Sequence, residues 1–104
     1  MGAPGEYPIV FLHHGESLIV FFRGSVKANH SYALYQQLEE WLQAKPVPKI
    51  FLDLHQATYI DSTTVGTLIK IRKLQHARGA RCVLTNLSEP VRKILSQMKL
   101  VDYF

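Results

Sequence analysis

Short apolar runs alternate with segments of helical periodicity, and this alternation constrains the fold more than any other feature of the sequence. Residues 49–54 (KIFLDL) and 80–85 (ARCVLT) are short apolar runs without helical period, as is typical of buried central strands. A helix-like segment lies before, between and after them. Strands joined through a helix pair in parallel with a right-handed crossover, so the chain is predicted to form a small α/β sheet.

The N-terminal part predicts a β-hairpin at one side of this sheet. Two apolar runs, residues 8–12 and 18–22, flank a polar stretch around Gly15, which supplies the turn conformation that other residues resist. Gly24 ends the second run. Residues 55–60 (HQATYI), which follow the first central strand, are expected to form a loop.

Three segments carry the pattern of helices. The first has an apolar stripe formed by Leu34, Leu38, Trp41 and Leu42. Asn29 or Ser31 can cap its start. The second helix is expected over residues 62–78, and the third begins at the capping residue Ser88, with Pro90 in its first turn. The predicted order is β-β-α-β-α-β-α, a mixed sheet with an N-terminal hairpin and helices packed on it.

Length and composition indicate one packed domain over residues 1–104, because 47% of the chain is hydrophobic. The N-terminus lacks the basic and apolar regions of a signal peptide, and no apolar run approaches the ~18 residues of a membrane span. We therefore expect a cytoplasmic location without membrane insertion. The 12 basic and 8 acidic residues are scattered, and no nucleic-acid-binding motif is present, so direct nucleic-acid binding is not expected.

Motifs for catalysis and for cofactor binding are missing. Neither the dinucleotide fingerprint nor the P-loop pattern occurs, so no cofactor is expected. The five histidines have no acid or cysteine at metal-ligand spacing, and the single Cys82 is expected to be a buried, inert thiol. Ser62 lies beside Asp61, and His55 is near in sequence, but the Gly-x-Ser-x-Gly nucleophile elbow is absent. The sequence thus predicts no catalytic residue, no metal site and no enzyme.

Residues 59–68 (YIDSTTVGTL) place one acid and three hydroxyls at the predicted start of the second helix. One explanation is capping by a Ser or Asp side chain, which is worth about 1 kcal/mol. Capping accounts for one residue of the four. The other explanation is function, because α/β proteins place functional groups at the carboxyl ends of parallel strands. A hydroxyl exposed there can be phosphorylated and gain a charge of about −1.5 to −2.

The order of elements, together with the string YIDSTTVGTLIKI, resembles the STAS domain, the fold of bacterial anti-sigma factor antagonists. The resemblance covers nearly the whole chain and includes the C-terminal segment NLSEPVRKILSQMKLVDYF. It implies that Ser62, directly after the motif residue Asp61, is phosphorylated by a partner serine kinase that is also the anti-sigma factor. Thr63 then takes the variable position of the family's Asp-Ser-x-Gly-x-Gly motif, and Gly66 its second Gly.

The sequence departs from the family pattern at two places. Thr64 replaces the first Gly of the motif, where its side chain would crowd an approaching partner. After the hairpin, the family's Gly-Glu-Leu-Asp becomes Gly24, Ser25, Val26 and Lys27, so both acids are absent. The resemblance implies a partner-binding edge formed by Asp61, Ser62, Thr63, Thr64, Gly66, Gly24 and Ser25.

Two functional hypotheses follow. The first is a bacterial regulatory module that binds a kinase-type anti-sigma factor and is switched off by phosphorylation of Ser62. The second is a STAS subunit of a larger assembly, such as a stress-signalling scaffold or a lipid-transport ATPase complex, which acts by protein contact without phosphorylation. Thr64 and the missing acids favour the second hypothesis.

Overall fold

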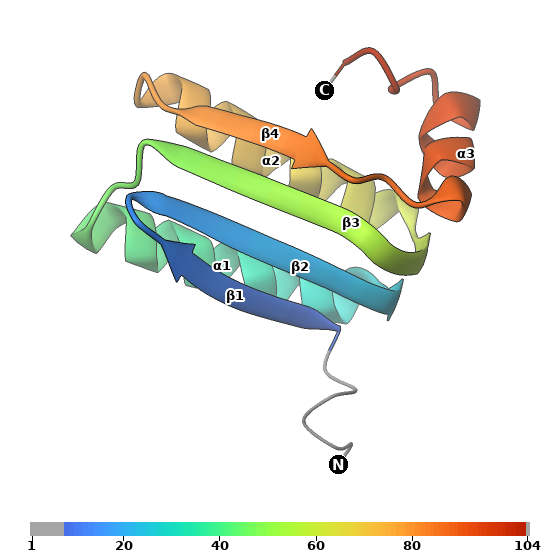
Figure 1. Cartoon of the computed structure of the whole chain (residues 1–104), viewed down its shortest axis with the longest axis horizontal. Helices are drawn as coiled ribbons and strands as arrows, with labels where there is room; N and C mark the ends of the chain where they lie inside the picture. The colour runs from blue at the N-terminus through green and yellow to red at the C-terminus, as the bar shows by residue number, and fades with distance from the viewer. Residues whose placement is uncertain (1–7, 104) are drawn as a thin grey trace.

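A computed structural model of the chain describes residues 8–103, which form four strands and three helices in the predicted order (Figure 1). The elements are β1 (Ile9–His14), β2 (Ser17–Val26), α1 (Ala28–Ala44), β3 (Lys49–Ile60), α2 (Ser62–Ala77), β4 (Arg81–Thr85) and α3 (Glu89–Gln97). The sheet order is β1-β2-β3-β4. The β1–β2 hairpin is antiparallel and the other two pairs are parallel. The predicted mixed α/β sheet is confirmed.

Helices α1 and α2 lie against one face of the sheet, and α3 lies at its end beside β3 (Figure 1). Because strand side chains alternate between faces, every second residue of β2 and of the first part of β3 points into the core. These buried residues are Leu18, Val20, Phe22, Ile50, Leu52 and Leu54. The sheet therefore has one face buried under helices and one face turned away from them.

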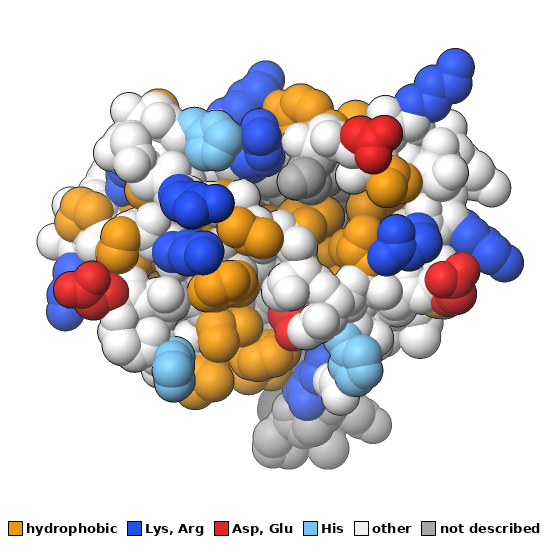
Figure 2. Space-filling view, turned by 45° about the horizontal axis from the view of Figure 1, so that its top comes forward, with side chains coloured by type: hydrophobic (Ala, Val, Ile, Leu, Met, Phe, Trp, Pro, Cys, Tyr) orange, Lys and Arg blue, Asp and Glu red, His pale blue; other side chains and the backbone are white. Residues whose placement is uncertain are grey.

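The second sheet face also carries apolar side chains. On β1, where Ile9 points into the core, its neighbour Val10 is 37% exposed and Leu12 is 48% exposed. Figure 2, turned from the view of Figure 1, shows hydrophobic side chains gathered in the middle of the visible surface, with Lys and Arg side chains among and around them.

Strand β3 is longer than predicted, because residues 55–60 form strand and not the expected loop. This half of β3 extends beyond Thr85, the last residue of β4 that pairs with it, and keeps only β2 as a strand neighbour. Register shifts after Phe21 and Gly24 disturb the alternation of buried residues. The run HQATYI thus lacks the regular period by which strands are recognised.

The C-terminal segment folds as predicted around Ser88, whose Oγ accepts a hydrogen bond from the N–H of Val91 at 3.3 Å and so caps α3. The same hydroxyl donates to the carbonyl of Ala57 at 2.6 Å, and the Ser88 N–H donates to the carbonyl of Leu54 at 3.2 Å. Ser88 therefore covers the edge of β3 that β4 leaves unpaired.

Two expectations for the first helix were wrong. Neither Asn29 nor Ser31 caps α1: its N-cap residue is Lys27, which makes no side-chain capping bond, and Ser31 lies buried inside the helix. The start of α1 is capped from elsewhere in the chain, because the Asp61 carboxylate accepts a hydrogen bond from the N–H of Ala28.

The second expectation concerns the apolar stripe of α1. Trp41 is 37% exposed, unlike the three leucines of the stripe, because its ring packs at the helix edge against Phe11 of β1.

Among residues 8–103, none of the three helices combines the length and the hydropathy that a membrane span requires. The same residues contain no group of three or more His, Cys, Asp or Glu side chains placed to hold a metal ion. Cys82 is buried as predicted, and burial raises the pKa of its thiol to about 12 despite the nearby charge of Arg72.

Candidate functional site

Asp61 lies at the carboxyl end of β3, where the two long helices begin. Its Oδ1 accepts a hydrogen bond from the N–H of Thr64 at 2.8 Å and caps α2. Its Oδ2 accepts one from the N–H of Ala28 at 3.0 Å, in the first turn of α1. One carboxylate therefore pairs with otherwise unpaired N–H groups of two helices. The predicted helix cap exists, but Asp61 supplies it and Ser62 does not.

The surroundings of Asp61 favour its charged form. Partial burial removes water and acts to raise the pKa, but hydrogen bonds from Thr64 and Ala28 outweigh it and leave the pKa of Asp61 below its ordinary value of 3.8. The positive ends of two helix dipoles also converge on this carboxylate. Asp61 is consequently a structural anion that ties the ends of β3, α1 and α2 together.

Thr64, which replaces the first Gly of the family motif, is fully buried. Its Oγ1 donates a hydrogen bond to the carbonyl of Val26 at 3.1 Å, across 38 residues of sequence. This bond fixes α2 to the end of β2. The side chain adds no bulk to the surface, so the expected crowding of a partner by Thr64 does not occur.

Ser62 is the first residue of α2, and its side chain is exposed. Within residues 8–103 its hydroxyl has no hydrogen-bond partner, in contrast to Asp61 and Thr64 on either side. Thr63 and Gly66 are half-buried on the same turn and the next. Of the acid and three hydroxyls that stood out in the sequence, Ser62 is thus the most exposed and is not tied into the fold.

Gly24 and Ser25 lie beside this helix start, because β2 and β3 end at the same edge of the sheet. Gly24 has a positive φ of 65°, which suits glycine, at a shift in strand register. Ser25 is exposed and pairs in register with Tyr59 of β3. The fold therefore brings the predicted residues of the two segments together, with Thr64 as the member that faces inward.

Tyr59 is a surface residue that the sequence analysis did not single out. Its ring is 45% exposed, two residues before Asp61, and its backbone neighbours Ser25. The only sequence signal was an aromatic residue in a stretch expected to be a loop. We use the name Ser62 edge for the residues at the ends of β2 and β3 and the start of α2 that are not fully buried: Gly24, Ser25, Tyr59, Ser62, Thr63 and Gly66.

His55, weighed as a partner for Ser62 in catalysis, takes part in a different arrangement. Its backbone N–H donates to Asp53 Oδ1 at 2.9 Å, while Asp53 Oδ2 accepts from Asn86 Nδ2 at 3.1 Å. The second of these contacts joins the middle of β3 to the residue that follows β4. They give Ser62 neither a base nor an orienting group.

The chain also matches a known family. The chain belongs to the STAS domain family, whose pattern matches residues 8–104. One relative within it is the Anti-sigma F factor antagonist of Paenibacillus polymyxa, which is 26% identical over 88 residues, or 85% of this chain and 75% of the relative.

Solved structures show the same fold. The unphosphorylated form of the anti-sigma factor antagonist SpoIIAA matches with a TM-score of 0.82 at 18% identity, over 91% of this chain and 84% of that one. The phosphorylated form of SpoIIAA, a Bacillus cell fate determinant, matches with a TM-score of 0.76 at 17% identity, over 91% and 86% of the two chains. The chain thus has the architecture of the SpoIIAA antagonist.

Proposed function

We propose that this protein is an anti-sigma factor antagonist that binds a kinase-type anti-sigma factor through the Ser62 edge and is switched off when that partner phosphorylates Ser62. The observation that carries the proposal is the exposed Ser62 hydroxyl, which has no partner within residues 8–103 while the neighbouring polar side chains of Asp61 and Thr64 serve the fold. The family membership and the antagonist named among its relatives support this assignment. The ATP and magnesium for the transfer would belong to the kinase.

The energetics require Ser62 to be covered by the partner. A hundredfold loss of affinity on phosphorylation corresponds to about 2.7 kcal/mol. An exposed pair of charges supplies less than about 1 kcal/mol, which is too little. Burying a phosphate beside the Asp61 carboxylate costs more, because two like charges would be desolvated together. Asp61 therefore has a second effect, because its negative charge raises the free energy of a complex in which Ser62 is phosphorylated and buried.

Mass spectrometry of protein isolated from its native cells tests the modification. The tryptic peptide of residues 50–70 contains Ser62, and we expect a phosphorylated fraction together with a copurifying chain of kinase fold. An unmodified peptide under several growth conditions, without a kinase among the copurifying chains, would overturn the proposed switch.

Binding measurements on the isolated complex test the surface. We expect Ser62→Asp to lower affinity for the anti-sigma factor at least tenfold and Ser62→Ala to retain binding. Ser96→Asp is the matched control, because Ser96 is an exposed serine on α3 and receives the same charge. Equal effects of the two Asp variants would show that net charge, and not the Ser62 edge, controls association.

A second candidate is a subunit of a larger STAS assembly that functions without phosphorylation. The observation that favours it is Lys27, an exposed cation at the start of α1, where the family commonly carries an acid. A partner adapted to that acid would meet the opposite charge here. Copurification of scaffold or transporter subunits, with assembly unaffected by Ser62→Ala, would select this candidate over the switch.

A further inference from the structure

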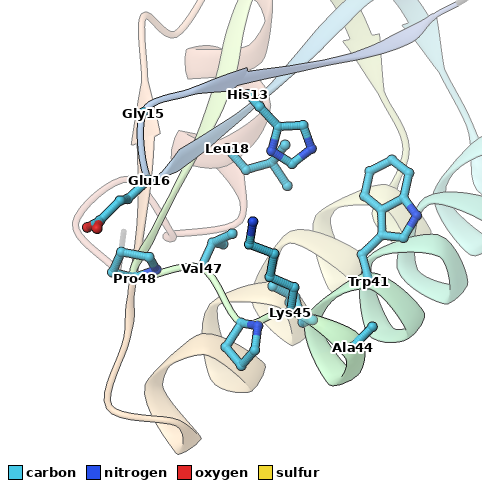
Figure 3. A pocket seen from close by; sticks show the side chains of 11 residues that line it. His13, Gly15, Glu16, Leu18, Trp41, Ala44, Lys45, Val47 and Pro48 are labelled. Atoms are coloured by element: carbon cyan, nitrogen blue, oxygen red, sulfur yellow. The ribbon is translucent and has the colours of Figure 1, made fainter.

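A cavity lies at the end of the molecule remote from Ser62, between the turn of the β1–β2 hairpin and the end of α1. Its volume is about 580 Å³, within the range of roughly 300–1,000 Å³ typical of small-ligand sites. Its walls come from the hairpin, the last turn of α1 and the loop that leads into β3 (Figure 3). None of these residues belongs to the Ser62 edge, so the cavity is a separate site.

The walls are largely apolar and include an aromatic ring. Leu18 and Leu42 form the buried side, while Val47 and its flanking prolines form the loop side. Trp41 is 37% exposed at this cavity, and its ring meets the edge of Phe11 with ring centroids 4.8 Å apart. The indole is thus held in place by Phe11 and still presents surface to a ligand.

The polar groups at the cavity favour a negatively charged ligand. In Figure 3 the Lys45 side chain extends from the end of α1 toward Leu18, and the His13 ring lies above it. The ammonium of Lys45 forms no ion pair with the described residues 8–103. The carboxylate of Glu16 points away from Lys45 at the rim. A cation and an imidazole, which can donate a hydrogen bond, therefore stand beside an apolar chamber.

We propose that this cavity binds a small aromatic carboxylate, with the ring of the ligand against Trp41 and its carboxylate on the ammonium of Lys45. An aromatic ring gains contact energy with the indole beyond the area that it buries. The carboxylate of the ligand supplies the negatively charged partner that the Lys45 ammonium lacks. His13 offers the carboxylate a second hydrogen-bond donor. The proposal is independent of the switch at Ser62 and assigns the protein a second, small-molecule site.

The test uses 4-phenylbutyrate as the probe. Trp41 is the one tryptophan of the chain, so tryptophan fluorescence reports on this cavity alone. We expect a saturable change in its emission with a dissociation constant of about 10⁻³ M or lower, as suits a ligand of this size in an open site. The neutral amide 4-phenylbutyramide should bind about three- to fivefold more weakly, because the contribution of a solvent-accessible charge pair is modest.

Lys45→Met tests the charge, since Met keeps an apolar side chain of similar length. We expect this variant to bind the acid and the amide equally, while Lys93→Met, at an exposed lysine on α3, keeps the wild-type preference. Amide chemical shifts should change at Leu18, Trp41 and Lys45. Non-saturable fluorescence, equal binding of acid and amide to the wild type, or shift changes confined to Ser62 and its neighbours would each overturn the proposal.

Discussion

The two ends of α1 have opposite characters. At its start, the N–H of Ala28 donates to Asp61, whose other oxygen caps α2, and Thr64 below it bonds to the end of β2. At its end, Lys45 and Trp41 border an open cavity. The polar start looked functional in the sequence, yet most of its polar atoms are paired within the fold. The comparison teaches that a cluster of polar residues in the sequence can serve the fold, because the side chains of Asp61 and Thr64 are bonded within it while those of Ser62 and Lys45 have no such bond among residues 8–103.

The largest effect is expected from Asp61→Ala. This change leaves N–H groups of two helices without their acceptor, and we expect the free energy of unfolding to fall by about 2–3 kcal/mol. Urea denaturation measures the loss. Asp102→Ala is the control, because Asp102 is exposed near the end of the chain. If both variants were equally stable, Asp61 would not hold the two helices together.

Thr64→Val should have the next largest effect and lower the free energy of unfolding by about 1–2 kcal/mol. The buried carbonyl of Val26 loses its donor, while the shape of the side chain is kept. Thr63→Val, one residue earlier and half-buried, is the matched control and should change stability by less than about 0.5 kcal/mol. The same limit applies to Ser62→Ala. A loss of about 1 kcal/mol for Ser62→Ala would instead make Ser62 a capping residue.

Low pH should reduce the contribution that the Asp61 carboxylate makes to the free energy of unfolding. Because the folded-state pKa of Asp61 lies below 3.8, its contribution to stability is fully present above that value and is lost as pH falls through the folded-state pKa. We expect the stability difference between wild type and Asp61→Asn to shrink when unfolding is measured near pH 3 instead of pH 7. A difference that stayed constant, or grew, would show that the charge of Asp61 does not stabilise the fold.

The smallest effect is expected from Lys45→Met at the other end of α1. Lys45 makes no ion pair with the described residues, so removing its charge should change the free energy of unfolding by less than about 0.5 kcal/mol. Thermal unfolding of Lys45→Met and Asp61→Ala under the same conditions compares the two ends of α1 directly. A loss above 1 kcal/mol would show that Lys45 serves the fold, and the contrast between the two ends would fail.

Local pattern predicted the order of elements, the hairpin and the capped start of α3, because each depends on residues close together in sequence. The cap from Asp61 to Thr64 is also local, but the bonds from Ala28 to Asp61 and from Thr64 to Val26 join residues 33 and 38 positions apart, and no local pattern contains them. The same limit applies to Gln75, whose buried amide donates to the carbonyls of Val47 and Arg81 at 3.1 Å each. Ser62 could be selected from the sequence only through its place in a family motif.

Ser88 limits how a partner can approach the Ser62 edge. Since β4 is short, the carboxyl half of β3 would offer free backbone carbonyls to an incoming strand, but Ser88 already bonds to those of Leu54 and Ala57. An added strand would have to displace these two bonds in order to extend the sheet at this side. In the proposed complex, recognition would therefore depend on side chains at the beginning of α2, and a phosphate on Ser62 would change that small surface directly.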